Sequence, residues 1–138
     1  MDIQINFLSV AAATIVAYII GALWYSVLFQ KQWMVVTGFD KRSPEEQKAM
    51  AKEAMPLYGI QFVITFIEAF VLAHFMNVWN DTVGIETALW VLVGFAMPTL
   101  IGAVIWSGAK HVWLQLGIQA ACQVVTLIAM GLVIGLWI

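Results

Sequence analysis

The sequence predicts an all-α integral membrane protein, a bundle of four transmembrane helices with a short amphipathic helix in a cytoplasmic loop. Of its 138 residues, 63% are hydrophobic and only 10% are charged, which is too apolar for an ordinary soluble domain. Four apolar segments are long enough to cross a bilayer core of about 30 Å as helices. The basic residues all fall on one side of these segments. The length predicts a single domain over residues 1–138.

The first apolar segment, at about 6–29, is expected to be a retained helix. It begins after Met-Asp-Ile-Gln, so it lacks the basic region of a signal peptide, and it is longer than a signal peptide's apolar core. The other three spans are expected at about 57–79, 86–106 and 112–137.

The connection between the first two spans contains the stretch DKRSPEEQKAMAKEAMP. Ser43 can cap a helix, Pro44 suits its first position, and Glu46 completes a capping box with Ser43. A short helix is therefore predicted at about 44–55, with Gly38 closing whatever precedes it. Its small apolar face would rest on the membrane surface. Docking of a cytoplasmic partner is the alternative.

The distribution of basic residues predicts the orientation. Five lie between the first and second spans and one lies in the connection between the third and fourth, while the opposite side has none. Because Lys and Arg favour the cytoplasmic side, loop 30–56 should be cytoplasmic and both termini should face outward. The six residues are Lys31, Lys41, Arg42, Lys48, Lys52 and Lys110.

Several functions are excluded or disfavoured. The net charge of −2 argues against nucleic acid, which requires a basic surface. The single cysteine, Cys122, cannot form a disulfide within one chain and is expected to be a buried thiol. His74 lies about 120° around its helix from Glu68, so the two do not form a metal motif. The sequence contains no HExxH, GxSxG or Walker motif. We therefore expect no catalytic residue, no metal and no cofactor.

Glu68 is the main candidate functional residue, because it stands in the apolar run FVITFIEAFVLAHF. A charged carboxylate at the bilayer centre costs at least about 2.5 kcal/mol, and desolvation favours the neutral acid. At about 100° per residue, the polar residues of three spans form stripes that are expected to converge with Glu68 near the membrane midplane. They are Gln61 and Thr65 on the second span, Gln119, Gln123 and Thr126 on the fourth, and Tyr18 on the first.

Pro98 lies near the middle of the third span. It removes a helical donor and so frees the carbonyl group of Gly94. A protonated Glu68 or a glutamine amide could satisfy that carbonyl group. A simple packing kink is the alternative.

Two functions remain open for this polar cluster. One is a site for binding or permeation of a small solute, an ion or a proton, because transporters place such sites at the midplane. The other is a non-catalytic structural or accessory role, in which the cluster fixes helix packing or oligomerisation. Gly131 and Gly135 form a small-xxx-small face that predicts a homo-oligomer, most simply a dimer in the lipid bilayer.

The first span also carries a motif. Gly21-Ala22-Leu23-Trp24-Tyr25-Ser26, followed by Phe29, Lys31, Trp33 and Met34, resembles the domain of unknown function 1761 family of small bacterial four-helix membrane proteins. Val27 stands where members often have proline after the serine. The resemblance implies a location in the bacterial inner membrane and implies no activity.

Overall fold

The computed structural model describes residues 3–137, and these residues form helices and connecting turns without a β-strand. Four stretches are long and apolar enough to cross a membrane. They are α1 (Phe7–Leu23) with a π-helical turn to Leu28, α3 (Pro44–Val78), α4 (Ile85–Val91) joined through a π-helical turn at Leu92–Ala96 to α5 (Met97–Ile105), and α6 (Val112–Gly135). This all-helical architecture with long apolar helices is that of a helical membrane protein.

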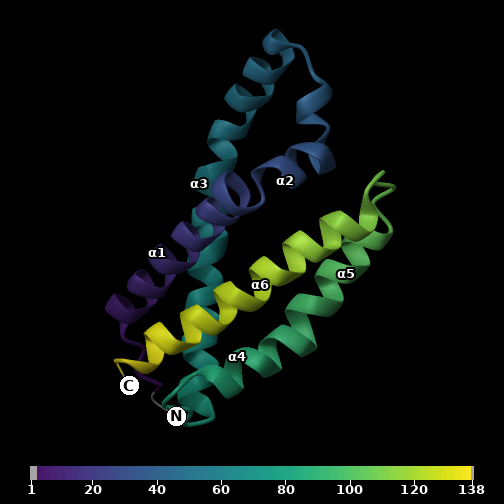
Figure 1. Ribbon diagram of the computed structural model, residues 1–138. Coiled ribbons are helices and arrows are strands. Elements are labelled where there is room, and N and C mark those ends of the chain that lie inside the picture. Colours follow the sequence, from purple (N-terminus) through teal and green to yellow (C-terminus); the bar gives the residue numbers. More distant parts are fainter. Residues whose placement is uncertain (1–2, 138) are drawn as a thin grey trace.

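The helices are arranged around α1 and α6 (Figure 1). α6 packs against α1 on one side and against α4 and α5 on the other. α3 packs mainly against α1 and also contacts α6 and α4, whereas it has little or no contact with α5. The start of α1 and the end of α6 lie at the end of the bundle that holds the α3–α4 loop. The first half of α3 and the short helix α2 (Gln30–Thr37) project from the opposite end.

The core lies where α1, α3 and α6 meet near the end that holds the α3–α4 loop. Five of its twelve residues are alanine, so helix backbones approach closely, and two methionines fill remaining gaps. It is built from Val10, Ala13 and Ala17 of α1, Ala69, Leu72, Ala73 and Met76 of α3, and Leu127, Met130 and Ile134 of α6, together with Ala88 and Leu92. The outward faces are also apolar, as lipid contact requires.

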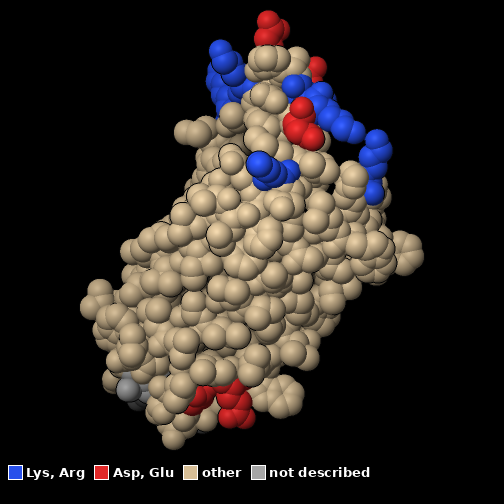
Figure 2. Space-filling model, in the orientation of Figure 1, with Lys and Arg blue, Asp and Glu red and all other residues tan. Residues whose placement is uncertain are grey.

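Charged residues are separated between the two ends of the molecule (Figure 2). Lys and Arg gather at the end formed by α2 and the first half of α3, together with acidic residues. At the opposite end, the charged residues within 3–137 are both acidic, Asp81 and Glu86. The body between the two ends shows no charged side chain on the face in view.

The helix expected at 44–55 is not a separate element. It continues through Pro56 into the second span as one 35-residue helix, α3. Pro56 removes the donor for the carbonyl group of Lys52, but Lys52 is exposed, so water can satisfy that group. The preceding residues are strong helix formers. The segment therefore extends the span outward instead of turning to lie along the membrane surface.

The caps in this region follow the sequence pattern in part. Ser43 accepts a hydrogen bond from the backbone N–H of Glu46 at 3.2 Å, and Gly38 ends α2 in the left-handed conformation with φ of 73°. The Glu46 carboxylate pairs with Arg42 at 3.4 Å instead of completing the capping box. Helix α2 itself was not predicted, since its apolar pattern is weak.

The motif at the end of the first span holds α1 against α6. After Leu23 the helix widens into the π-helical turn Trp24–Leu28 and breaks at Phe29, so the chain bends without a proline at position 27. The Trp24 indole N–H donates to the carbonyl oxygen of Ile118 on α6 at 3.0 Å. The Trp24 side chain therefore anchors this end of α1 to α6.

The small face of α6 is used within the chain, which corrects the expectation that Gly131 and Gly135 form an oligomer contact. A methyl group added at Gly131 would collide with the backbone of Gly84 in the α3–α4 loop. One added at Gly135 would lie 2.7 Å from the carbonyl oxygen of Val83 and 2.9 Å from that of Thr82. The spacing of small residues indicated close packing, but it could not say which segment packs there.

We predict that Gly131→Ala destabilises the fold by about 1–3 kcal/mol, because the methyl group would overlap the Gly84 backbone, which cannot rotate away. Gly135→Ala should cost less. The matched control is Gly117→Ala on the same helix, where nothing lies within 4 Å of the added atom. Thermal unfolding in mild detergent would measure all three, and equal midpoints for Gly131→Ala and Gly117→Ala would contradict the packing.

Candidate functional site

Glu68 lies on α3, where the helix faces α6. Its side chain is half-buried and accepts a hydrogen bond at Oε1 from Nε2 of Gln123 at 3.4 Å. The neighbouring residue Ala69 is fully buried in the core, as is Leu72 one turn further along. Glu68 therefore sits at the edge of the packed region, and its one hydrogen bond within residues 3–137 links two long helices.

Three of the other predicted site residues bond within their own helices. The Thr65 hydroxyl donates to the carbonyl oxygen of Gln61 at 2.7 Å and accepts from the Gln61 side-chain amide at 3.4 Å. The Thr126 hydroxyl donates to the carbonyl oxygen of Cys122 at 2.9 Å. Such bonds satisfy a hydroxyl in an apolar surrounding without a partner from another helix. The hydrogen bonds of these residues are therefore satisfied locally, and none of them goes to Glu68.

Tyr18 and Gln119 form no hydrogen bond with the glutamate. The Tyr18 hydroxyl donates to the carbonyl oxygen of Tyr58 at 3.0 Å. Tyr58 is ten residues before Glu68, which is about 15 Å along a helix. Gln119 lies one turn from Gln123 and makes no hydrogen bond to Glu68. Of the polar residues that were expected to meet at Glu68, Gln123 is the one that forms a hydrogen bond with it.

The second carboxylate oxygen of Glu68 is accessible at the surface of the chain. Oε2 has no hydrogen-bond partner among the described residues. Every buried side-chain oxygen or nitrogen atom in that part of the chain does have a partner, so Oε2 is not one of the buried atoms. Oε2 is therefore not enclosed. In an apolar environment such an atom needs a proton, water or a polar group from outside the chain.

Pro98 has a different consequence from the one expected. The helix accommodates it by widening into the π-helical turn Leu92–Ala96 directly before α5. A π-helical turn shifts the hydrogen bonds by one residue and kinks the helix. Neither Glu68 nor Gln123 bonds to Gly94. Gly94 instead lines a groove at the opposite side of the α3–α4 hairpin.

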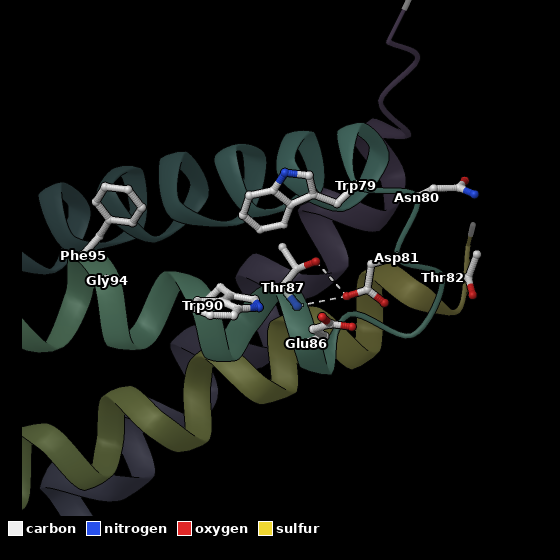
Figure 3. A pocket seen from close by; sticks show the side chains of 9 residues that line it. All are labelled: Trp79, Asn80, Asp81, Thr82, Glu86, Thr87, Trp90, Gly94 and Phe95. Atoms are coloured by element: carbon white, nitrogen blue, oxygen red, sulfur yellow. Dashed lines mark hydrogen bonds between the residues drawn. The ribbon is translucent and has the colours of Figure 1, made fainter.

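This groove, of about 550 Å³, is a feature that the sequence pattern did not predict (Figure 3). It lies between the end of α3 and the outer face of α4, and none of the predicted site residues lines it. Its wall is aromatic and polar and consists of Trp79, Asn80, Asp81, Thr82, Glu86, Thr87, Trp90, Gly94 and Phe95.

Asp81 organises the loop beside the groove. Its Oδ1 accepts from the backbone N–H groups of Val83 and Gly84 at 3.0 and 2.9 Å. Its Oδ2 accepts from the backbone N–H and the hydroxyl of Thr87 at 3.0 and 2.7 Å. Partial burial raises the pKa of Asp81, but these hydrogen bonds, led by the one from Gly84, outweigh it and lower the pKa to about 2. Asp81 is therefore a charged cap on α4.

A signal for this cap was present in the sequence. Asp81 stands three residues before Gly84, which adopts a positive φ of 87°, and six before Thr87. An aspartate followed by a glycine and a helical pattern is typical of a turn that leads into a helix. The aromatic residues of the groove carried no separate signal, since tryptophan is common at both membrane interfaces.

Within residues 3–137, no three His, Cys, Asp or Glu side chains form a group that could hold a metal ion. The structure therefore offers two separate candidate sites. One is the Glu68 carboxyl group bonded to the Gln123 amide at the α3–α6 contact, and the other is the open groove at the end of the bundle.

The fold and these sites define a small, all-helical protein with the properties of an integral membrane protein. A family profile described as Protein of unknown function (DUF1761) matches residues 8–135, so the chain belongs to that family. The match extends the resemblance seen in the first span over almost the whole chain. No curated protein and no solved structure gives a significant match.

The Asp81 cap predicts a pH dependence of stability. Because the folded-state pKa of about 2 lies below the ordinary 3.8, the cap stabilises the fold above about pH 4 and this contribution is lost as the pH falls toward 2. We expect the unfolding temperature of the parent to fall over that range and that of Asp81→Asn to fall less.

The control for this experiment is Asp40→Asn, which removes an exposed aspartate from the opposite end of the molecule. It should retain the pH dependence of the parent. Thermal unfolding in non-ionic detergent at several pH values would measure it. A parent and an Asp81→Asn variant with parallel pH profiles would show that Asp81 does not act as a charged cap.

Proposed function

We propose that this protein is a non-catalytic structural or accessory protein with four transmembrane helices in the bacterial inner membrane. The Glu68–Gln123 hydrogen bond supports this function best. It joins the side chains of two long helices directly, whereas the hydroxyl groups of Tyr18, Thr65 and Thr126 donate to backbone carbonyl groups. A polar bond between membrane helices fixes their register and is worth about 1 kcal/mol.

The accessible oxygen of Glu68 supports lateral assembly. Isolated contact of a carboxyl group with lipid is unfavourable, and a helix from a second copy would cover it. Ile64 and Val71, one turn before and one turn after Glu68 on α3, are exposed and give this stretch of the helix an apolar surface for a second copy. The proposed contact surface for a homo-oligomer is thus the edge of α3 around Glu68. It replaces the Gly131–Gly135 face, which the chain itself occupies.

A second candidate is a binding site for a proton or a small cation at Glu68. It is favoured by the absence of any Lys or Arg partner for this carboxylate in residues 3–137, where the single salt bridge is Arg42–Glu46. An unpaired acid inside the membrane is a common feature of ion and proton pathways. The intrahelical bonds of Thr65 and Thr126 count against a continuous polar path.

The proposed orientation places the α2 end in the cytoplasm and both termini outside. It is supported by the position of all six basic residues at or beside one end of the molecule. Single cysteines at Ser43 and Thr82, in a Cys122→Ala background, should react with membrane-impermeant reagents from opposite sides. Thr82 is chosen because it is exposed and leaves the Asp81 cap intact. Labelling of both sites from outside in intact cells would exclude this topology.

A double-mutant cycle tests the helix contact. Glu68→Leu and Gln123→Leu should show a coupling energy of about 0.5–1 kcal/mol in unfolding experiments, because each variant removes the same bond. The control cycle pairs Glu68→Leu with Gln119→Leu, which should be additive, since Gln119 does not bond to Glu68. Native mass spectrometry of Glu68→Leu should also show a smaller dimer fraction than the parent. Additive behaviour in both cycles would refute the structural role.

Glu68→Gln separates the two candidates, since it retains hydrogen bonding and cannot titrate. The structural function predicts parental stability and dimer fraction for this variant. The cation-binding function predicts a folded protein that has lost pH-dependent flux in reconstituted vesicles. Flux in the parent that disappears in Glu68→Gln would favour the second candidate over the first.

A further inference from the structure

The groove beside α4 has the shape and the chemistry of a binding site that is separate from Glu68. We propose that it binds a phospholipid with an ammonium headgroup from the outer side of the membrane. The headgroup would lie between Trp79, Glu86 and Trp90, and the first part of an acyl chain would run toward Phe95.

The length of the groove indicates an amphiphilic ligand. Its polar end is made by the loop residues Asn80–Thr82 and by Glu86, and its other end by Gly94 and Phe95. Glu86 and Phe95 are nine residues apart on one continuous span, which corresponds to about 13 Å along the helix axis. A molecule that fills this groove must be polar at one end and apolar at the other. Membrane lipids have this form and reach this depth.

The charges of the groove favour a cationic headgroup. A helix N-terminus can bind a phosphate, but here Asp81 already accepts from the N–H groups of Gly84 and Thr87. Glu86 is exposed and forms no ion pair within residues 3–137. No Lys or Arg lies at this end of the molecule in the described chain. An anionic lipid would meet an unneutralised carboxylate, whereas an ammonium group would neutralise it.

The two tryptophan rings provide the second element of ammonium recognition. Trp79 and Trp90 are 51% and 62% exposed, and they come from the end of α3 and from α4. Figure 3 shows the two rings on either side of Thr87, with Glu86 between Trp90 and Asp81. Phe75 stacks on Trp79 with a centroid distance of 5.3 Å, which fixes one ring and leaves its other face open. The open faces of tryptophan attract cations most strongly among the aromatic residues.

Native mass spectrometry in mild detergent can test this site with two lipids of identical chains, phosphatidylethanolamine and phosphatidylglycerol. The parent should bind the ethanolamine lipid about fivefold more tightly. Glu86→Gln and Trp90→Leu should each reduce this ratio to near one. The matched controls Glu53→Gln and Trp113→Leu change exposed residues elsewhere on the chain and should leave the ratio unchanged.

Three results would overturn the proposal. Equal binding of both lipids by the parent would exclude ammonium selectivity. A ratio in Glu86→Gln equal to that of the parent would show that Glu86 does not recognise the headgroup. Displacement of the lipid by free ethanolamine at the same concentration would show that the apolar end of the groove does not contribute. The site does not involve Glu68, so these outcomes are independent of the double-mutant cycle on the α3–α6 contact.

Discussion

Gly84 and Gly131 allow the α3–α4 loop to lie directly on the backbone of α6, and most of the architecture depends on this contact. Neither position has room for a methyl group. Asp81 holds the loop in the conformation that the contact requires, since it accepts from Val83, Gly84 and Thr87 and caps α4. The contact places α4 against α6 and turns the chain from α3 into the third span. It also sets Trp79 and Trp90 on two sides of one groove.

The hydrogen bonds of the polar side chains within the spans reflect the absence of water in a membrane interior. In a membrane, a polar side chain that has no partner is costly, so Thr14, Thr65 and Thr126 bond to carbonyl groups of their own helices. The donor hydrogens of these hydroxyl groups are therefore not free to line a polar pathway. Glu68 cannot satisfy both carboxylate oxygens in this way, so it reaches Gln123 across the α3–α6 contact and keeps one oxygen accessible. An assembled state with a second copy or a bound cation would satisfy this oxygen.

Two departures from α-helical geometry shape the bundle. The π-helical turn at Trp24–Leu28 ends the first span and directs the chain into α2, while the indole of Trp24 fastens this end to α6. The π-helical turn at Leu92–Ala96 precedes Pro98 and places Gly94 on the wall of the groove. Widened turns of this kind are common at functional positions. Here one of them borders the groove that carries the lipid proposal.

The sequence by itself determined the features that depend on local chemistry and overall composition. The all-helical class, the long apolar helices, the Ser43 cap and the left-handed Gly38 follow from hydropathy, hydrogen-bonding side chains and the lack of a Cβ atom in glycine. Each of these can be derived from a short window. The family assignment also followed from the motif at Gly21–Ser26 and is confirmed over residues 8–135.

Only the tertiary structure decided which groups meet. A helical stripe shows which residues share a face, but it does not show the rotation, depth or partner of that face. Gln61, Thr65 and Thr126 therefore appeared to converge with Glu68, although their bonds remain local. Gly131 and Gly135 indicated close packing, and their partner proved to be the chain's own loop. Pro56 suggested a helix boundary, yet α3 continues because the freed carbonyl group lies where water can reach it.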